Sequence, residues 1–447
     1  MDDMKAARAI DALEARTMAK VMRRLVPFLM LCYFVAYLDR VNVGFAGATM
    51  RADLGLTAAA FGGAAGIFFI AYFFFEVPSN LALDRFGARL WIARIMFTWG
   101  LISGAQAFVG GETSFNVVRL LLGVAEAGFF PGIIFFLTLW FPSAYRARVV
   151  GLFMFAIPIS TVIGAPISGL ILSLDGAAGL HGWQWVFMLE AVPALLMSVA
   201  TFIYLTDRPR DAAWLAPEER AWLQERLDAE RALRESRNRH SWRQAIVDPR
   251  VIALGFVYMA CNIPQYGLSF FLPQIVKAFG GLSNFEVGFV TAIPYAVGAI
   301  GMILWSRSSD RTRERKSHVI VPFAAMIVGL LLATVMPSPS LKMAAVCVAG
   351  FGFFAILPVF WTLPTALLSG TGAAAGIAAV NSIGNLGGYF GPQVFGLLKD
   401  NTGGDVASLV FLAACAVVGA VIVMWLGHDS SLEQAPAEGT TRLPNRA

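Results

Sequence analysis

Charged side chains inside long apolar runs are the first chemical feature of this sequence. They lie in the N-terminal half and are Asp39, Arg40, Glu76, Arg94, Arg119, Glu126 and Glu190. Charged groups in apolar, membrane-like segments are costly and by default mark ligand pathways or proton relays. The apolar runs of the C-terminal half carry no charge away from their ends. We therefore expect one half to hold the charge chemistry and the other to supply polar and aromatic contacts.

Arg40 and Arg119 are the predicted anion ligands. A guanidinium group is always charged, and its planar fork of donors matches a carboxylate. The alternative is an internal ion pair with Asp39 or Glu126 that holds helices together. Both interpretations hold in turn if an arginine exchanges a carboxylate of the protein for that of a ligand.

Asp39 and Glu126 are the predicted proton carriers. Removal from water favours the protonated form of a carboxyl group, whereas a neighbouring arginine favours the ionised form. A carboxyl group balanced between these effects can change protonation as its surroundings open to water. Glu126 is the stronger candidate because its place in its run puts it near mid-membrane. Asp39, adjacent to Arg40, could instead be a permanent counter-ion.

The remaining intramembrane charges have less support as functional groups. Glu76 and Glu190 lie close to Pro78 and Pro193, and we expect structural roles for both. Arg94 lies near the end of its run and is expected to reach the interface with its charged group.

The elements that must position these residues are transmembrane helices. Hydrophobic residues make up 57% of the 447 residues and charged residues only 14%, against roughly a quarter charged in soluble proteins. Apolar runs long enough to cross the hydrocarbon core, about 30 Å thick, recur along the chain. Their approximate bounds are 25–47, 59–82, 91–109, 116–140, 149–173, 184–205, 251–276, 285–306, 318–336, 341–366, 375–398 and 406–427. The sequence thus predicts an all-α, polytopic membrane protein with twelve lipid-embedded helices.

Basic residues predict the topology. They concentrate before the first run and in alternate connections, as positively charged cytoplasmic segments do. Both termini are therefore expected in the cytoplasm. The predicted parts are a cytoplasmic N-terminal segment (1–24), a six-helix half (25–205), a cytoplasmic linker (206–248), a second six-helix half (249–427) and a cytoplasmic tail (428–447).

The linker 206–248 contains a helix start signal, Pro217 followed by Glu218 and Glu219. Leucine and tryptophan side chains leave an apolar stripe behind it. We expect an amphipathic helix at the cytoplasmic membrane face, with a solvated linker helix as the equal alternative.

Two copies of an Asp-Arg motif occupy equivalent points of the halves. Asp84-Arg85 follows the second apolar run, and Asp310-Arg311 follows the eighth. These loops resemble the signature of the major facilitator superfamily. The resemblance implies two pseudo-symmetric six-helix halves with a site between them, and it implies conformational gating by Asp84, Arg85, Asp310 and Arg311.

Finer motifs resemble the anion:cation symporter branch of that superfamily, in particular its tartrate, 4-hydroxyphenylacetate and phthalate permeases. They are Tyr37-Leu-Asp39-Arg40-Val-Asn42 and the stretch from Arg119 to Gly132 with Glu126 at its centre. This resemblance implies a proton-coupled importer of a small organic carboxylate in the cell's inner (plasma) membrane, working by alternating access. The substrate is expected to be a tartrate-like hydroxy-diacid or an aromatic acid. The additional substrate ligands that we predict are Tyr37, Tyr72, Trp361, Asn381 and Asn385.

Other functional classes are less well supported. A proton-coupled exporter of organic or drug-like compounds is the main alternative, because Gly164-Ala-Pro166-Ile-Ser-Gly169 faintly resembles an antiporter element. The histidines and cysteines are dispersed, so we expect no metal site and no cofactor, and no enzyme motif is present. The net charge of +5 follows the topology and does not indicate nucleic acid. The expected partners are a small organic anion, protons and lipid, and we expect a monomer.

Overall fold

The computed structural model describes residues 2–237, 247–312, 314–367 and 371–426. The predicted tail, 428–447, and part of the predicted linker lie outside these residues. The described chain is helical, and its helices are α1 (Asp2–Asp53), α2 (Ala58–Phe86), α3 (Ala88–Ala105), η1 (Gln106–Phe108), α4 (Glu112–Glu126), α5 (Phe129–Thr138), α6 (Ser143–Met154), α7 (Ala156–Leu172), η2 (Ala177–Gly179), α8 (Gly182–Tyr204), η3 (Pro209–Asp211), α9 (Pro217–Arg237), α11 (Pro249–Lys277), α12 (Asn284–Thr312), α13 (Lys316–Val335), α14 (Pro339–Phe360), α15 (Thr362–Leu367), α16 (Thr371–Asn385), α17 (Gly387–Thr402) and α18 (Val406–Trp425).

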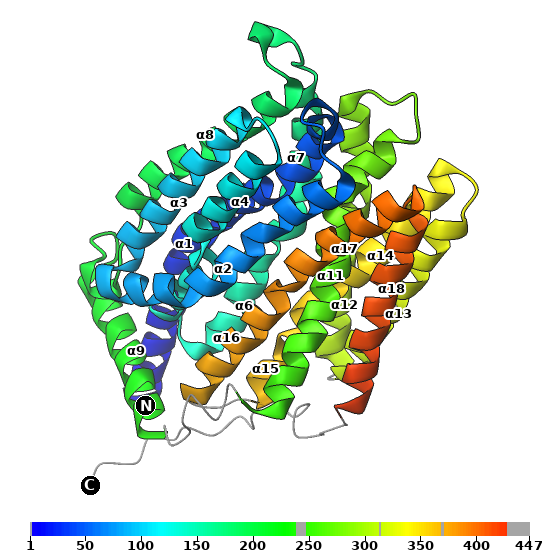
Figure 1. The fold of residues 1–447 in the computed structure, drawn as a ribbon. Helices are drawn as coiled ribbons and strands as arrows, with labels where there is room; N and C mark the ends of the chain where they lie inside the picture. Colours follow the sequence, from blue (N-terminus) through cyan, green and yellow to red (C-terminus); the bar gives the residue numbers. More distant parts are fainter. Residues whose placement is uncertain (1, 238–246, 313, 368–370, 427–447) are drawn as a thin grey trace.

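These helices confirm the prediction of a twelve-span membrane protein. Ten helical segments of the described residues are long and apolar enough to cross a membrane, and α3 and the consecutive pair α16–α17 complete the set. Figure 1 shows the helices as two neighbouring groups, α1–α8 and α11–α18. Large apolar side chains such as Leu81, Ile203, Leu304 and Trp425 are exposed on the outside. A surface of this kind is suited to lipid.

Four of the predicted spans are broken into two helices. The breaks lie between α4 and α5, α6 and α7, α14 and α15, and α16 and α17. In the first of these, Gly128 has φ +86°, and a Cβ atom there would lie 2.4 Å from Ser79 Oγ. Hydrophobicity did not predict the breaks, because a kink leaves an apolar run uninterrupted.

The two groups of helices approach most closely at the ends that the predicted topology places outside. At Gly62 of α2, an added Cβ would lie 2.2 Å from Pro392 O of α17. At Gly288 of α12, it would lie 2.3 Å from Ala165 O of α7. Backbone contact of this kind requires glycine, as in other membrane helix pairs. The groups are therefore packed shut at this end.

The predicted linker helix is present as α9, and it packs on the protein near the N-terminal end of the chain (Figure 1). Leu223 is buried. Glu219 is also buried and accepts hydrogen bonds from Lys20 Nζ at 2.7 and 2.9 Å. Desolvation raises the pKa of Glu219, but the hydrogen bond from Lys20 and the charges of Lys20 and Arg16 outweigh it and lower that pKa. α9 thus packs against α1, with Leu223 of its apolar stripe buried.

Candidate functional site: a cavity between the two halves

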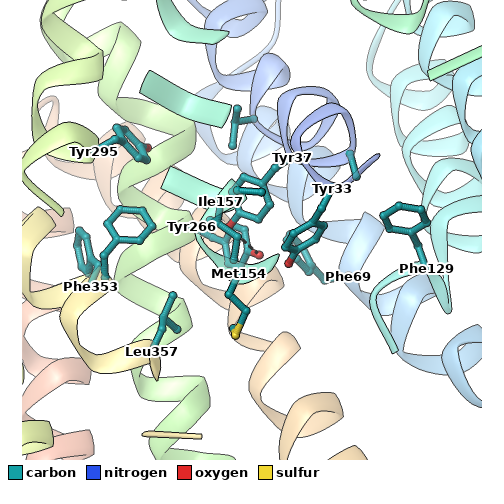
Figure 2. Close-up of a cluster of buried hydrophobic side chains, with 14 of the residues drawn as sticks. Tyr33, Tyr37, Phe69, Phe129, Met154, Ile157, Tyr266, Tyr295, Phe353 and Leu357 are labelled. Atoms are coloured by element: carbon teal, nitrogen blue, oxygen red, sulfur yellow. Dashed lines mark hydrogen bonds between the residues drawn. The ribbon is translucent and has the colours of Figure 1, made fainter. Parts of the chain in front are cut away.

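A buried cavity lies where the two groups of helices face each other. It is small in this conformation, with a volume of about 30 Å³. Its lining is aromatic and polar and consists of Tyr33, Tyr37, Arg40, Tyr72, Phe130, Met154, Ile157, Tyr258, Asn262, Gln265, Tyr266, Leu357, Asn381 and Asn385. Figure 2 shows Tyr37 and Tyr266, from opposite groups, close together at its centre. Such a concave site between helices is typical of small-molecule binding.

Arg40 is the cationic group of this cavity. It comes from α1, is 9% exposed, and its Nη2 forms an ion pair with Oε1 of Glu126 at the end of α4. Its guanidinium carbon lies 5.6 Å from the ring centre of Tyr37 and 5.7 Å from that of Tyr72. These rings add a favourable electrostatic contact for the cation. Arg40 and Glu126 therefore combine the two interpretations made from the sequence, a lining cation and an internal ion pair.

Arg119 lies outside the cavity lining. It is fully buried, its Nη2 donates to Ala65 O at 2.7 Å, and its Nε and Nη1 have no hydrogen-bond partner. Its guanidinium carbon lies 5.1 Å from the centre of the Phe68 ring, and that of Arg40 lies 5.4 Å from the same ring. The two predicted anion ligands thus share an aromatic neighbour, but only Arg40 faces the cavity.

Asp39 also lies behind the cavity wall, within the N-terminal group. Its carboxylate accepts hydrogen bonds from Trp99 Nε1, from Ser103 Oγ at 2.9 Å and from Asn42 Nδ2 at 3.3 Å. Three donors satisfy an ionised carboxylate well. Trp99 and Ser103 were not predicted, since nothing in the spacing of α3 relates them to Asp39.

The C-terminal group supplies the polar wall. Gln265 Nε2 donates to Tyr37 Oη at 3.1 Å, which ties α11 to α1. Asn381 Nδ2 donates to Glu76 Oε1 at 2.8 Å, which ties α16 to α2. Asn385, one turn further along α16, also lines the cavity. Glu76 thus bridges the two groups directly beside the cavity.

Trp361 does not line the cavity, but it contacts a residue that does. It occupies the break between α14 and α15, and its ring centre lies 5.1 Å from that of the lining residue Tyr258. Tyr33 and Tyr258 are lining residues that were not predicted. Spacing could have found Tyr33, because it precedes the predicted ligand Tyr37 by one helical turn.

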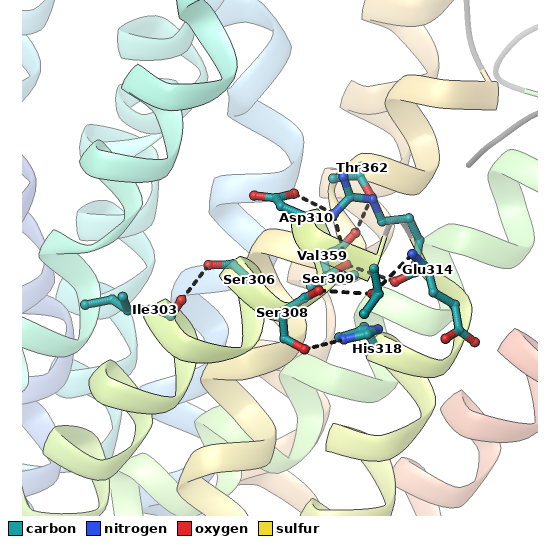
Figure 3. A network of polar contacts seen from close by, with 11 residues as sticks. Ile303, Ser306, Ser308, Ser309, Asp310, Glu314, His318, Val359 and Thr362 are labelled. Atoms are coloured by element: carbon teal, nitrogen blue, oxygen red, sulfur yellow. Dashed lines mark hydrogen bonds and ion pairs between the residues drawn. The ribbon is translucent and has the colours of Figure 1, made fainter. Parts of the chain in front are cut away.

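The two Asp-Arg motifs lie at helix ends and are not part of the cavity lining. Asp84 and Arg85 are exposed at the end of α2. Asp310 forms an ion pair with Arg315 at 2.7 Å, whereas Arg311 is exposed. Figure 3 shows Asp310 and Ser309 beside Val359 and Thr362, where α14 gives way to α15. The gating role of these four residues stays a prediction.

Helices that span a membrane and a central cavity between two six-helix groups define a membrane transporter rather than an enzyme. The family model of the Major Facilitator Superfamily matches residues 29–392. The chain belongs to this superfamily.

Several relatives share most of their length with the chain. It is 50% identical over 434 residues to a protein of Agrobacterium vitis named "Putative tartrate transporter", covering 97% of this chain and 95% of the relative. It is 45% identical to the "Quinolone resistance transporter" of Acinetobacter baumannii, covering 89% and 92% of the two chains. It is 40% identical to the "Inner membrane transport protein RhmT" of Escherichia coli, covering 92% and 95%.

Solved structures show the same fold. A bacterial homologue of the human lysosomal transporter Spinster, in an inward-facing and occupied conformation, superposes with a TM-score of 0.73 at 17% identity, covering 92% of this chain and 98% of the other. The xylose transporter XylE of E. coli, in a partially occluded inward-open conformation, gives 0.70 at 17% identity, covering 91% and 97%. The prediction of a two-half fold of this superfamily is confirmed.

Proposed function

We propose that the chain imports a small organic carboxylate together with protons by alternating access. The observation that carries this proposal is the buried Arg40–Glu126 ion pair at the wall of the central cavity. A buried ion pair is stable only while both partners are present. An incoming carboxylate can replace Glu126 on Arg40, and Glu126 can then take up a proton instead of remaining an unpaired charge.

This exchange couples substrate to proton. Substrate and proton favour the same rearranged state, and two ligands that stabilise one state bind cooperatively. Asp39, one residue from Arg40, is the second proposed proton carrier. The charge of Arg119 lies close to the Arg40–Glu126 ion pair but outside the cavity lining. We therefore assign Arg119 an electrostatic role in anion binding. Closure and reopening then move the halves 25–205 and 249–427 against each other, with gating by the Asp-Arg loops.

The polar wall supports a hydroxy-diacid of the tartrate kind as substrate. The amide nitrogens of Gln265 and Asn381 already donate within the protein, so their carbonyl oxygens remain as acceptors. Acceptors opposite a cation suit a molecule that carries hydroxyl groups next to a carboxylate. The name of the A. vitis relative agrees with this assignment. The aromatic lining keeps an aromatic acid as the second member of the substrate class.

We place the transporter in the inner membrane as a monomer, with both termini in the cytoplasm. The relative RhmT is named as an inner membrane protein. The arginines Arg146 and Arg148 near the start of α6, and Arg307 and Arg311 near the end of α12, favour the side on which they lie as cytoplasmic.

Uptake into proteoliposomes tests the proposal. Purified protein is reconstituted, and labelled tartrate uptake is measured with an inward proton gradient and with none. We expect accumulation only with the gradient and its loss when a protonophore is added. Uptake that ignores the gradient would remove proton coupling, and no uptake of tartrate or of 4-hydroxyphenylacetate would remove the substrate class.

A second candidate function is export of drug-like compounds in exchange for protons. The observation that favours it is the 45% identity to the Quinolone resistance transporter. Flux in inside-out vesicles compared with right-side-out vesicles distinguishes the two directions. Import predicts that a quinolone neither moves nor competes with tartrate.

A further inference from the structure

Glu190 of α8 is a buried carboxyl group that neither belongs to the Arg40–Glu126 ion pair nor lines the cavity. It is 2% exposed. Its Oε1 accepts a hydrogen bond from Ser168 Oγ of α7 at 2.5 Å, and its Oε2 has no hydrogen-bond partner. A buried carboxylate with a single donor is poorly satisfied, since each oxygen can accept two hydrogen bonds.

The balance of buried charges in the N-terminal group also disfavours an ionised Glu190. Within the N-terminal group, Arg40 is paired with Glu126, and Arg119 lies near Glu126 and Asp39. Two guanidinium groups can thus balance at most two of the four buried carboxyl groups, Asp39, Glu76, Glu126 and Glu190, and Glu76 accepts hydrogen bonds only from the neutral Asn381 and Ser382. Glu190 has no cation: α7 contains no ionisable residue, the arginines of α3 lie in its first two turns at the opposite end, and Asp39 of α1 is the ionisable group that acts on Glu190. An ionised Glu190 would therefore be a buried charge without a cation beside it, which strongly destabilises a folded protein.

Asn42 connects Glu190 with Asp39. Its Nδ2 donates to Asp39, its side chain also interacts with Glu190, and its Oδ1 is buried without a donor. Asn42 Oδ1 and Glu190 Oε2 are both buried, and both lack a hydrogen-bond donor. One proton on Glu190 would supply the donor that this pair of oxygens lacks.

We propose that Glu190 is a further proton-binding site of the transporter, protonated in this conformation and exchanging its proton with Asp39 across Asn42. The amide of Asn42 can serve both states, because it donates to whichever carboxyl group is ionised and accepts from the one that is protonated. When Asp39 gains a proton, Glu190 has released one, so the total charge of the pair is unchanged. Glu190 lies eight residues after Gly182, the first residue of α8, or about 12 Å along the helix. It thus lies between Asp39 and the end of the bundle at which the two halves are packed shut.

Infrared spectroscopy tests the proton-binding site without any substrate, although the role in transport rests on the proposed proton coupling. A protonated carboxyl group has a carbonyl band separate from that of a carboxylate. We expect wild-type protein at neutral pH to show such a band, E190Q to lack it, and D39N to keep it. S168A is expected to shift the same band, because Ser168 donates to Glu190, and this variant serves if E190Q does not fold. An unchanged spectrum in E190Q, or no shift in S168A, would overturn the proposal.

The role in transport is measured as accumulation of tartrate in proteoliposomes at an imposed gradient of one pH unit. Loss of one coupled proton lowers the accumulation ratio about tenfold per pH unit, so E190Q should fall by that factor. The matched control is E112Q, which removes an exposed carboxylate at the first residue of α4 and should accumulate as wild type does. A missing infrared band together with wild-type accumulation in E190Q would overturn the exchange with Asp39. If wild type does not accumulate tartrate at all, the proposed function fails while the infrared result still stands.

Discussion

The two halves of this transporter differ in how they use polarity. The spans of the N-terminal half bury Asp39, Arg40, Glu76, Arg119, Glu126 and Glu190. The described spans of the C-terminal half bury mainly uncharged polar groups, among them Asn262, Gln265, Thr291 and Asn381, and the buried titratable residue His318 lies at the start of α13. Charges in a low-dielectric interior interact strongly and change with protonation, whereas amides and hydroxyls do not titrate. The comparison suggests that one half senses protons and charge while the other recognises shape and hydroxyl groups.

The largest effect is expected from a substitution at the centre of the charged half. R40Q removes the cation and leaves Glu126 buried without a partner. Removing one partner of a buried pair costs about 2–5 kcal/mol, which corresponds to a loss of uptake efficiency of about thirtyfold to several thousandfold. Initial rates of tartrate uptake measure it. The control is R23Q, which removes an exposed arginine of the same helix outside the predicted span; an equal loss there would contradict the comparison.

The second prediction concerns the contact between the halves. G62A places a Cβ against Pro392 O, where overpacking costs about 1–3 kcal/mol. We expect the outer ends to separate, with a longer distance between spin labels at Ala52 and Thr402. G151A is the control, because nothing lies within 4 Å of its Cβ. An unchanged distance distribution in G62A would show that this contact does not hold the halves closed.

The third prediction separates proton coupling from anion binding. E126Q keeps a hydrogen-bonding side chain beside Arg40 but cannot take up a proton. Accumulation driven by one pH unit should fall about tenfold, while exchange of internal for external substrate continues. Counterflow assays measure the second property. Loss of both activities to the same degree would mean that Glu126 is structural.

The fourth prediction probes the uncharged half. N385A removes one polar group from the cavity lining without touching a charge. An uncharged hydrogen bond contributes about 0.5–1.5 kcal/mol, so KM for tartrate should rise about two- to tenfold. The proton dependence of uptake should stay that of wild type. A changed proton dependence would place titrating chemistry in the C-terminal half as well.

Sequence analysis predicted the fold and the side of the molecule that carries charge, because the cost of burying charge in lipid is visible in composition. It left open which arginine pairs with which carboxyl group, and the structure pairs Glu126 with Arg40 of another helix. Which helices touch depends on kinks such as that at Gly128, and hydrophobic periodicity does not record kinks. The sequence also did not relate Glu190 to its neighbours Ser168 and Asn42, because they come from two other helices.

The smallest expected effect lies outside the membrane. E219Q weakens the attachment of α9 to α1 by removing the charge that Lys20 and Arg16 face, worth about 0.5–1 kcal/mol for partly exposed pairs. Because the pKa of Glu219 is lowered in the folded protein, its stabilisation is complete above the unfolded pKa of about 4.3 and disappears as pH falls through the folded value. Thermal unfolding of both proteins should therefore differ at pH 7 and converge in acid. A difference independent of pH would indicate a packing effect instead.

The central claim is that anion and proton bind at one linked site around Arg40 and Glu126. Calorimetric titration of tartrate in buffers of different ionisation enthalpy counts the protons taken up on binding. The account predicts uptake of protons by wild-type protein and a smaller uptake by E126Q at the same pH. Binding without proton uptake, or equal uptake by both proteins, would contradict it.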